Sequence, residues 1–297
     1  MITLTEFVRT KDSDIGYEVS GPEGGAPLVA VRGWPDDPRC WSGLLPAWHD
    51  ARYRVYRPYL RGIGLPRFRS DDKMRSGRIG ALGHDLACFL EALDLYQVSL
   101  VGHDWGTRAG YVVGALFPQR VARLVAMSAG YATNRADVQL SWPLPHAYWS
   151  EWFVATERGR RAIHEDRRLL ARYLWRSWSP EWEFQVAEFA QAADAWDNDD
   201  WPHITAHAYL HRWAKPRVTP AMTTSSVACS NPPPVRVPTL VLHIAHDGDN
   251  LPETSANKSA LFTAEYERIA LPDAGHFPPR ETPDQVADLI FSHQGGG

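Results

Sequence analysis

The sequence GHDWG at residues 102–106 decides the fold that we predict. It follows an apolar run at 97–101 that is typical of a buried strand, and it precedes an apolar stretch at 111–116 that is typical of a helix. Its two glycines allow strand and helix to pack closely, and a strained turn lifts the Asp104 side chain above the sheet. The alternative is an ordinary turn in which Asp104 caps the helix. The rest of the chain favours the strained turn.

Strands and helices alternate on both sides of this turn. Apolar and alternating runs predict further strands at 5–9, 15–20, 28–31, 52–57, 121–127, 238–244 and 266–271, the first two forming a hairpin. Helical spacing of apolar residues predicts helices at 41–49 and 79–93. The alternation indicates an α/β fold with a mostly parallel eight-stranded sheet flanked by helices.

One long block interrupts this alternation. From about Tyr131 to Val227 the pattern is helical, aromatic and charged, and the block holds nine of the 13 tryptophans. A helical block inserted between two strands predicts a cap over the strand ends. We therefore expect a core formed by residues 1–130 and 228–297, with a helical cap at 131–227.

Composition excludes several classes of protein. The net charge of -4 gives no reason to expect nucleic acid or an anionic membrane as a partner. The three cysteines, Cys40, Cys88 and Cys229, are far apart, which argues against a disulfide framework or a zinc site. No apolar run approaches the ~20 residues of a membrane span, and the first residues lack a signal-peptide pattern. We expect a cytoplasmic protein.

Two further groups complete a catalytic pattern with Asp104. His276 follows the strand at 266–271, and Asp247 and Asp249 follow the strand at 238–244. The carboxyl ends of parallel strands meet at one edge of a sheet, so these side chains are predicted to gather there. The chain order of nucleophile, acid and histidine is the order of an α/β-hydrolase triad. Sequence leaves both Asp247 and Asp249 open as the acid.

An aspartate at the elbow implies a different chemistry from a serine. A carboxylate with an ordinary pKa of about 3.9 is ionised at pH 7 and can attack a saturated carbon without a base. The product is an alkyl ester, which water activated by His276 can hydrolyse. The tetrahedral oxyanion of that step needs donors, and the backbone N–H groups of Trp34 and Trp105 are the candidates.

With these motifs the chain resembles the α/β-hydrolase superfamily, in its epoxide hydrolase and haloalkane dehalogenase branch. The resemblance runs from about residue 15 to 290 and is carried by RGWP at 32–35, RGIG at 61–64, GHDWG at 102–106 and GHFP at 275–278. It implies an aspartate nucleophile, a histidine base, a relay acid, a helical cap, and no cofactor or metal. The relay acid of the branch precedes a proline by a few residues, which favours Asp247 over Asp249.

One position departs from the branch pattern. The loop after the third strand usually begins with histidine, and Arg32 occupies that position here. The usual histidine braces the oxyanion loop by hydrogen bonding. Arg32 can brace the loop with its charge or can contact a substrate, and a chain that binds an intermediate without hydrolysing it stays an alternative.

The cap directs the choice of substrate. Epoxide hydrolases of this branch use two cap tyrosines to stabilise the alkoxide, and Tyr209 and Tyr148 are the candidates, with Tyr173 as a further one. The tryptophans assigned to substrate binding are Trp34, Trp105, Trp149 and Trp152. They suit a large apolar, aromatic or polycyclic epoxide that is opened by water to a vicinal diol. Haloalkane dehalogenation is the main alternative, and a homodimer stays open.

Overall fold

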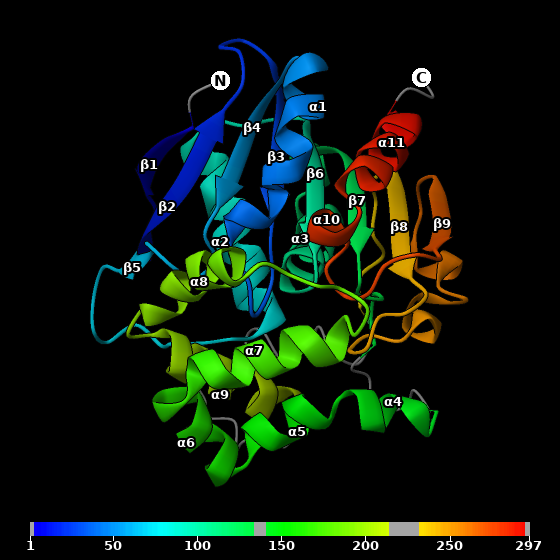
Figure 1. Ribbon diagram of the computed structural model, residues 1–297. Coiled ribbons are helices and arrows are strands. Elements are labelled where there is room, and N and C mark those ends of the chain that lie inside the picture. Colours follow the sequence, from blue (N-terminus) through cyan, green and yellow to red (C-terminus); the bar gives the residue numbers. More distant parts are fainter. Residues whose placement is uncertain (1–2, 134–140, 214–231, 295–297) are drawn as a thin grey trace.

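The computed structural model describes residues 3–133, 141–213 and 232–294, which form a central sheet between layers of helices (Figure 1). The strands of the described residues are β1 (Leu4–Arg9), β2 (Ser13–Ser20), β3 (Ala26–Val31), β4 (Tyr53–Pro58), β5 (Arg67–Phe68), β6 (Val98–His103), β7 (Val121–Met127), β8 (Thr239–Ile244) and β9 (Tyr266–Leu271). Their order is β1-β2-β4-β3-β6-β7-β8-β9, and β5 pairs with β2.

The eight predicted strands are all present and form the continuous path of the sheet. β1 and β2 pair antiparallel, as do β2 and β4, whereas every pairing from β4 across to β9 is parallel. The two-residue β5 is a ninth strand that the sequence does not predict, because a pairing this short leaves no periodic pattern. The predicted mostly parallel α/β sheet is confirmed.

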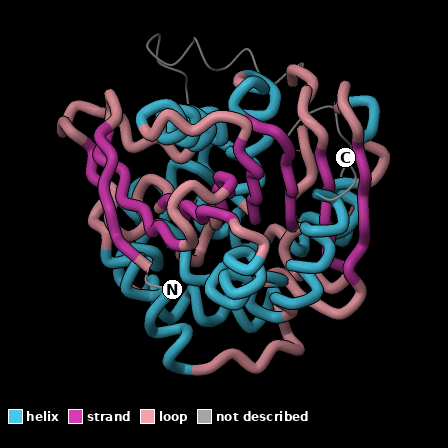
Figure 2. The backbone as a smooth tube through the Cα atoms, turned by 90° about the horizontal axis from the view of Figure 1, so that it is seen from above, coloured by secondary structure: helices cyan, strands magenta, loops and turns pink. Residues whose placement is uncertain are grey.

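Helices cover both faces of the sheet, as the view from above shows (Figure 2). The helices of the core are α1 (Leu45–Asp50), α2 (Ile79–Ala92), α3 (Trp105–Leu116), α10 (Pro278–Glu281) and α11 (Pro283–Gln294). Successive strand side chains point to opposite faces, so Val29 and Val31 join one apolar cluster while Leu28 and Ala30 join the other. Both faces of the parallel strands are therefore buried.

The helix predicted at 41–49 is wrong in one respect. The structure has a 3-10 helix, η1 (Pro38–Leu44), followed by the separate α1. Pro46 stands within the first turn of α1 and has no backbone N–H, so a continuous α-helix through it would lose a hydrogen bond. A new helix beginning there avoids the loss, since the N–H groups of a first turn have no helical partner.

Six α-helices lie between β7 and β8 in the described residues and extend across the carboxyl ends of the parallel strands (Figure 1). They are α4 (Pro143–Ala147), α5 (Trp149–Ala155), α6 (Glu157–Glu165), α7 (Arg167–Trp178), α8 (Val186–Asp194) and α9 (Trp201–Trp213). The predicted end of the cap at Val227 lies outside the described residues, as does Cys229. Below, "cap" means the helices α4 to α9.

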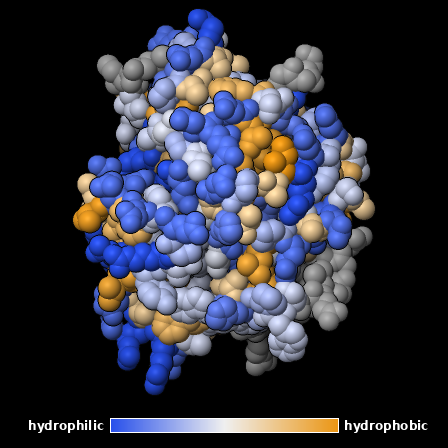
Figure 3. Space-filling model, turned by 45° about the vertical axis from the view of Figure 1, so that its right-hand side comes forward, coloured by the Kyte–Doolittle hydropathy of each residue, from blue (hydrophilic) through white to orange (hydrophobic). Residues whose placement is uncertain are grey.

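The outer surface is mixed in character. On the face shown in Figure 3, apolar side chains form small separate patches among hydrophilic ones. None of the helices in the described ranges combines the length and the apolar character that a bilayer-spanning segment needs.

Candidate active site

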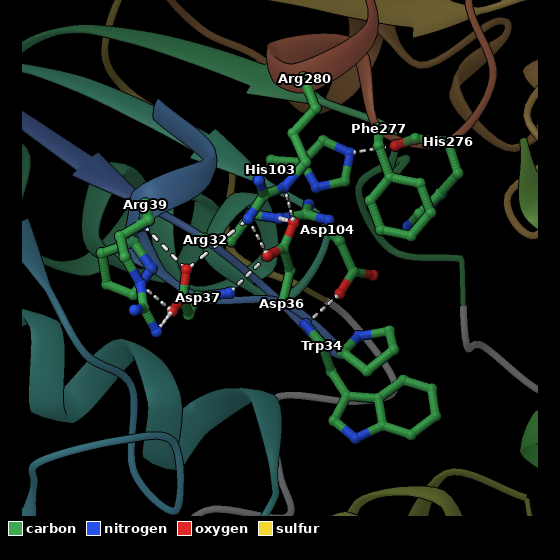
Figure 4. A network of polar contacts seen from close by, with 12 residues as sticks. Arg32, Trp34, Asp36, Asp37, Arg39, His103, Asp104, His276, Phe277 and Arg280 are labelled. Atoms are coloured by element: carbon green, nitrogen blue, oxygen red, sulfur yellow. Dashed lines mark hydrogen bonds and ion pairs between the residues drawn. The ribbon is translucent and has the colours of Figure 1, made fainter. Parts of the chain in front are cut away.

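Asp104 occupies the sharp turn between β6 and α3. Its backbone has φ of 49° and ψ of -116°, a conformation that is strained for a residue with a side chain. The carboxylate does not cap α3; instead its Oδ2 accepts a hydrogen bond of 2.9 Å from the backbone N–H of Trp34 (Figure 4). The capping alternative is therefore wrong, and Asp104 faces the loop that follows β3.

Two glycines make this arrangement sterically possible. A Cβ on Gly33 would lie 2.2 Å from Asp104 Oδ2 and 2.4 Å from the backbone nitrogen of Trp105. A Cβ on Gly106 would lie 2.0 Å from the carbonyl oxygen of Val31. The Asp104 carboxylate and the backbone N–H groups of Trp34 and Trp105, the predicted oxyanion donors, thus lie around the same position. A side chain on residue 33 would fill that position.

His276 reaches the same edge of the sheet from the loop after β9. Its Nδ1 lies 2.9 Å from Asp247 Oδ1, and its Nε2 is buried without a hydrogen-bond partner. Asp247 Oδ1 also accepts the N–H groups of Asp249 and Asn250, each at 2.9 Å. The carboxylate that lies against the His276 imidazole is therefore that of Asp247 and not that of Asp249. This is the position expected of a relay acid.

The three acid–base groups of the site lie close together. A carboxylate oxygen of Asp104, a carboxylate oxygen of Asp249 and a ring nitrogen of His276 all lie within 4.8 Å of one another. A small cation would also fit this spacing, but it would bind the Asp104 carboxylate and the His276 ring nitrogen at the same time. We interpret the cluster as an acid–base site.

The loop that carries His276 is held by hydrogen bonds between its backbone and two side chains. The Glu281 carboxylate accepts the N–H groups of Gly275 and Phe277, each at 2.7 Å, on either side of His276. The His276 carbonyl oxygen lies 2.6 Å from His103 Nε2, so the histidine of the GHDWG motif links the strained turn to this loop. His103 and Glu281 are positioning groups that our sequence reasoning missed. The Glu281 carboxylate five residues after His276 was the available signal.

Arg32 braces the oxyanion loop. Its Nε donates to Asp36 Oδ2 at 3.1 Å, and its guanidinium lies 5.1 Å from the centre of the Phe277 ring. Arg280 holds the same carboxylate with bonds of 2.9 and 2.7 Å (Figure 4). Burial raises the pKa of Asp36, but the charges of Arg280 and Arg32 outweigh burial and leave this pKa below its usual value. The bracing role considered for Arg32 agrees with these contacts.

The two predicted cap tyrosines lie on the inner side of the cap. Tyr209 is buried, and its ring centre lies 5.4 Å from that of Trp34 and 6.0 Å from that of Trp105. Tyr148 is also buried, and its hydroxyl donates to Asn250 Oδ1 at 3.2 Å. Tyr209 therefore packs against the indole rings of the two residues whose backbone N–H groups are the predicted oxyanion donors. Tyr148 instead contacts the loop that carries Asp247 and Asp249.

The predicted substrate-binding tryptophans separate into two pairs. Trp34 and Trp105 are buried and stacked, with ring centres 6.4 Å apart. Trp152 is 38% exposed and packs on Trp213, and the aromatic neighbours of Trp149 are likewise cap residues. The assignment of Trp149 and Trp152 to substrate binding stays a prediction. Ser150 and Glu151, which lie between them on α5, are both buried.

Glu151 belongs to a buried charged group that the sequence did not reveal. Its carboxylate accepts bonds of 2.6 Å from Arg212 Nη1 and from Trp213 Nε1. Burial raises the pKa of Glu151, and the charge of Arg212 opposes the rise. Asp249 is affected by this group, because burial and then the negative charge of Glu151 raise the pKa of Asp249 well above its usual value. The acid–base site is thus coupled electrostatically to the cap.

A separate groove of about 280 Å³ opens between η1, α8 and α10. It is lined by Arg39, Cys40, Ser42, Gly43, Glu188, Gln191, Pro279, Arg280 and Pro283. None of the predicted site residues contributes to this lining. We therefore assign the chemistry to the buried cluster around Asp104.

The comparisons with known proteins agree with this fold. A family model for the α/β hydrolase fold matches residues 26–281. Epoxide hydrolase B from Mycobacterium tuberculosis is 32% identical over 165 residues, which cover 50% of this chain and 46% of that protein. Epoxide hydrolase 4 from Mus musculus is 29% identical over 126 residues, which cover 41% and 34%. The chain thus spans less than half the length of these curated relatives.

Solved structures resemble the chain over nearly all of its length. A crystal structure of an epoxide hydrolase candidate from Klebsiella pneumoniae superimposes with a TM-score of 0.90 at 33% identity, covering 98% of this chain and 97% of that one. An α/β-hydrolase candidate from Nostoc superimposes with a TM-score of 0.84 at 19% identity, covering 99% of each chain. The second likeness supports the fold alone.

Proposed function

Because the chain belongs to the α/β-hydrolase fold family, we propose that it hydrolyses epoxides to vicinal diols through a covalent ester on Asp104. One observation carries the proposal. A buried carboxylate stands at the strained turn, within 4.8 Å of a ring nitrogen of His276, and His276 Nε2 has no hydrogen-bond partner among the described residues. The similarity to proteins named epoxide hydrolases supports the choice of substrate class.

In the first step, a carboxylate oxygen of Asp104 attacks an epoxide carbon. The new carbon–oxygen bond forms as the bond from that carbon to the ring oxygen breaks, so the ring oxygen leaves as an alkoxide that requires a proton. The bond from Trp34 N–H to Asp104 Oδ2 fixes the orientation of the carboxylate before the attack.

In the second step, water hydrolyses the ester. His276 takes a proton from the water through Nε2, while the Asp247 carboxylate at 2.9 Å from Nδ1 stabilises the imidazolium. The resulting oxyanion forms on the Asp104 carbonyl, next to the N–H groups of Trp34 and Trp105. Collapse of the tetrahedral intermediate releases the diol and regenerates Asp104 with one oxygen from water.

A single turnover in ¹⁸O-water tests the covalent route. Enzyme in excess over an aromatic epoxide such as styrene oxide should carry the heavy isotope in the Asp104 peptide, as read by mass spectrometry. The Asp104→Asn variant should lose at least about 10³-fold in rate, because the nucleophile is removed. Label found only in the diol would contradict the ester, and conversion by Asp104→Asn at the wild-type rate would remove the hydrolase assignment.

The same assay addresses dehalogenation. A panel of chloro- and bromoalkanes is incubated with the enzyme, and released halide is measured beside diol formation. Epoxide turnover without halide release is the expected result. Halide release that is faster than diol formation would instead favour a haloalkane dehalogenase using the same residues.

A further inference from the structure

We propose that Asp249 is a further catalytic residue of this site, the acid that protonates the ring oxygen released when Asp104 attacks an epoxide. The inference rests on the proposed function, which it deepens. It also separates the two candidate substrate classes, because a halide leaves without a proton whereas an alkoxide requires one.

The position of Asp249 carries the proposal. The residue is 3% exposed, and one of its carboxylate oxygens lies within 4.8 Å of both the Asp104 carboxylate and a ring nitrogen of His276. Oδ2 accepts a bond of 2.7 Å from Asn250 Nδ2, while Oδ1 is buried without a partner. Buried polar atoms almost always have partners, so an orphan atom here marks a place that a ligand completes.

The surroundings of Asp249 favour its protonated form. Burial raises its pKa, and the negative charges of Glu151, Asp247 and Asp104 raise it further, while Arg212 acts in the opposite direction. The titratable groups that face it from the core and the cap are Asp104, Asp247, His276, Tyr148, Glu151, Tyr209 and Arg212. An uncharged carboxylic acid is a donor, which the carboxylates beside it are not.

The cap tyrosines are weaker proton donors at this site. The Tyr148 hydroxyl already donates to Asn250 Oδ1 at 3.2 Å. Burial and the charges of Glu151 and Asp104 raise the pKa of Tyr209 well above its usual value. A phenol of this kind can hydrogen-bond to an alkoxide, but a carboxylic acid transfers its proton more readily. Tyr209 and Asp249 can therefore act on the same oxygen in different ways.

His276 restores the proton that Asp249 loses, which completes the proton balance of the reaction. Asp249 gives its proton to the alkoxide as the ester forms and becomes a carboxylate. The hydrolytic water then gives one proton to His276 and its oxygen to the ester carbonyl, and its second proton reaches the alcohol as the ester carbon–oxygen bond breaks. The imidazolium, whose ring lies within 4.8 Å of the Asp249 carboxylate, returns the first proton to Asp249. The net reaction is epoxide plus water to diol.

Two matched variants separate the steps by rapid quench and mass spectrometry of alkylated Asp104, with styrene oxide as the probe. Asp249→Asn should form the ester at least 10²-fold more slowly than the wild type, which is the usual contribution of a general acid. Asp247→Asn should form it within about 3-fold of the wild-type rate and hydrolyse it slowly, so that the ester accumulates. His246→Asn, at an exposed position on the same loop, should behave as the wild type in both steps.

The wild type supplies a second measurement that needs no variant. Its rate of ester formation should fall as pH rises and Asp249 loses its proton, and Asp249→Asn should lack this fall. A wild-type rate that does not fall at any pH at which the enzyme stays folded, or ester formation by Asp249→Asn within 3-fold of the wild type, would overturn the role of Asp249. In both cases ester formation itself would still support the proposed function, whereas a wild type that forms no ester would refute the function as well.

Discussion

The core side and the cap side of the site are built differently. On the core side, Asp104 and His276 stand on loops at strand ends, and each of the hydrogen bonds that hold them joins a backbone N–H or carbonyl group to a side chain. On the cap side, Tyr209 and Glu151 are held by ring packing and by side-chain hydrogen bonds. The core-side contacts thus involve the backbone of the loops, whereas these cap-side contacts join side chains only.

Gly33→Ala is the sharpest way to break the core side. The added methyl would lie 2.2 Å from Asp104 Oδ2 and 2.4 Å from the Trp105 nitrogen, so the carboxylate and the oxyanion donors must separate. Loss of one such donor costs about 3–4 kcal/mol, so we expect kcat to fall by about 10²–10³-fold. Steady-state diol formation measures the effect.

Gly43→Ala is the matched control for this change. Its methyl would lie 2.8 Å from Pro283 Cβ, which is also crowded but lies outside the site. This variant should lose stability while retaining kcat within a few fold. Equal losses of kcat in the two variants would show that crowding anywhere in the core, and not the geometry around Asp104, controls the rate.

Gly77→Ala tests how the cap is seated on the core. Its methyl would lie 2.3 Å from the Ile204 carbonyl oxygen and 2.6 Å from Ala208 Cβ, so α9 must move together with Tyr209. Overpacking of this kind costs about 1–3 kcal/mol of stability, and we expect kcat to fall about tenfold as Tyr209 leaves its position. Thermal unfolding and diol formation are measured together.

Gly83→Ala supplies the comparison within the core. Its methyl would lie 2.4 Å from Val112 Cβ, between α2 and α3, and it touches neither cap nor site. We expect a comparable loss of stability with kcat unchanged within about 3-fold. A loss of activity that simply follows stability in both variants would contradict a special role for the cap contact.

The smallest expected effect concerns pH and His207 on α9. Its Nδ1 accepts the N–H of Gly77 at 3.1 Å, and burial, with the charges of His211 and Arg78, lowers the pKa of His207 to about 4. The folded state therefore keeps the ring neutral while the unfolded chain binds a proton below pH 6.5. This stabilisation is complete above pH 6.5 and is lost as pH falls toward 4.

Partial solvent exposure of this ring limits the size of the effect to about 1 kcal/mol. His207→Gln keeps an acceptor and removes the titration. Denaturant unfolding between pH 4 and 7 should give a difference in stability between wild type and variant that changes by this amount, with the wild type losing more toward pH 4. A constant difference across this range would show that the cap contact does not depend on the charge of His207.

The difference between the core side and the cap side also explains which parts of the fold and of the site could be predicted from the sequence. The eight strands and the meeting of Asp104, His276 and Asp247 follow from apolar runs and from the rule that parallel strands end at one edge. The strained turn follows from the glycines around Asp104. These are local patterns combined with one topological rule, so a single chain suffices to find them.

The cap side was predicted less well for a physical reason. Which face of a helix turns inward depends on its neighbours, and on α5 a charged residue, Glu151, is buried because Arg212 and Trp213 donate to it. Trp152 beside it stays 38% exposed, against its hydrophobic character. Asp249 was considered only as a relay acid, since its closeness to Asp104 depends on how the loop after β8 folds.

The backbone carbonyl group of Trp178, at the end of α7, links the cap to two loops of the core. The carbonyl oxygen of Trp178 accepts the N–H groups of Gly248 and His276, both at 3.1 Å, so one atom of the cap is bonded to two catalytic loops. Lifting this corner would break both bonds together, at a cost of about 1 kcal/mol each. This corner of the cap is therefore anchored to both loops, and we expect the opening through which substrate passes to lie at another part of the rim of the cap.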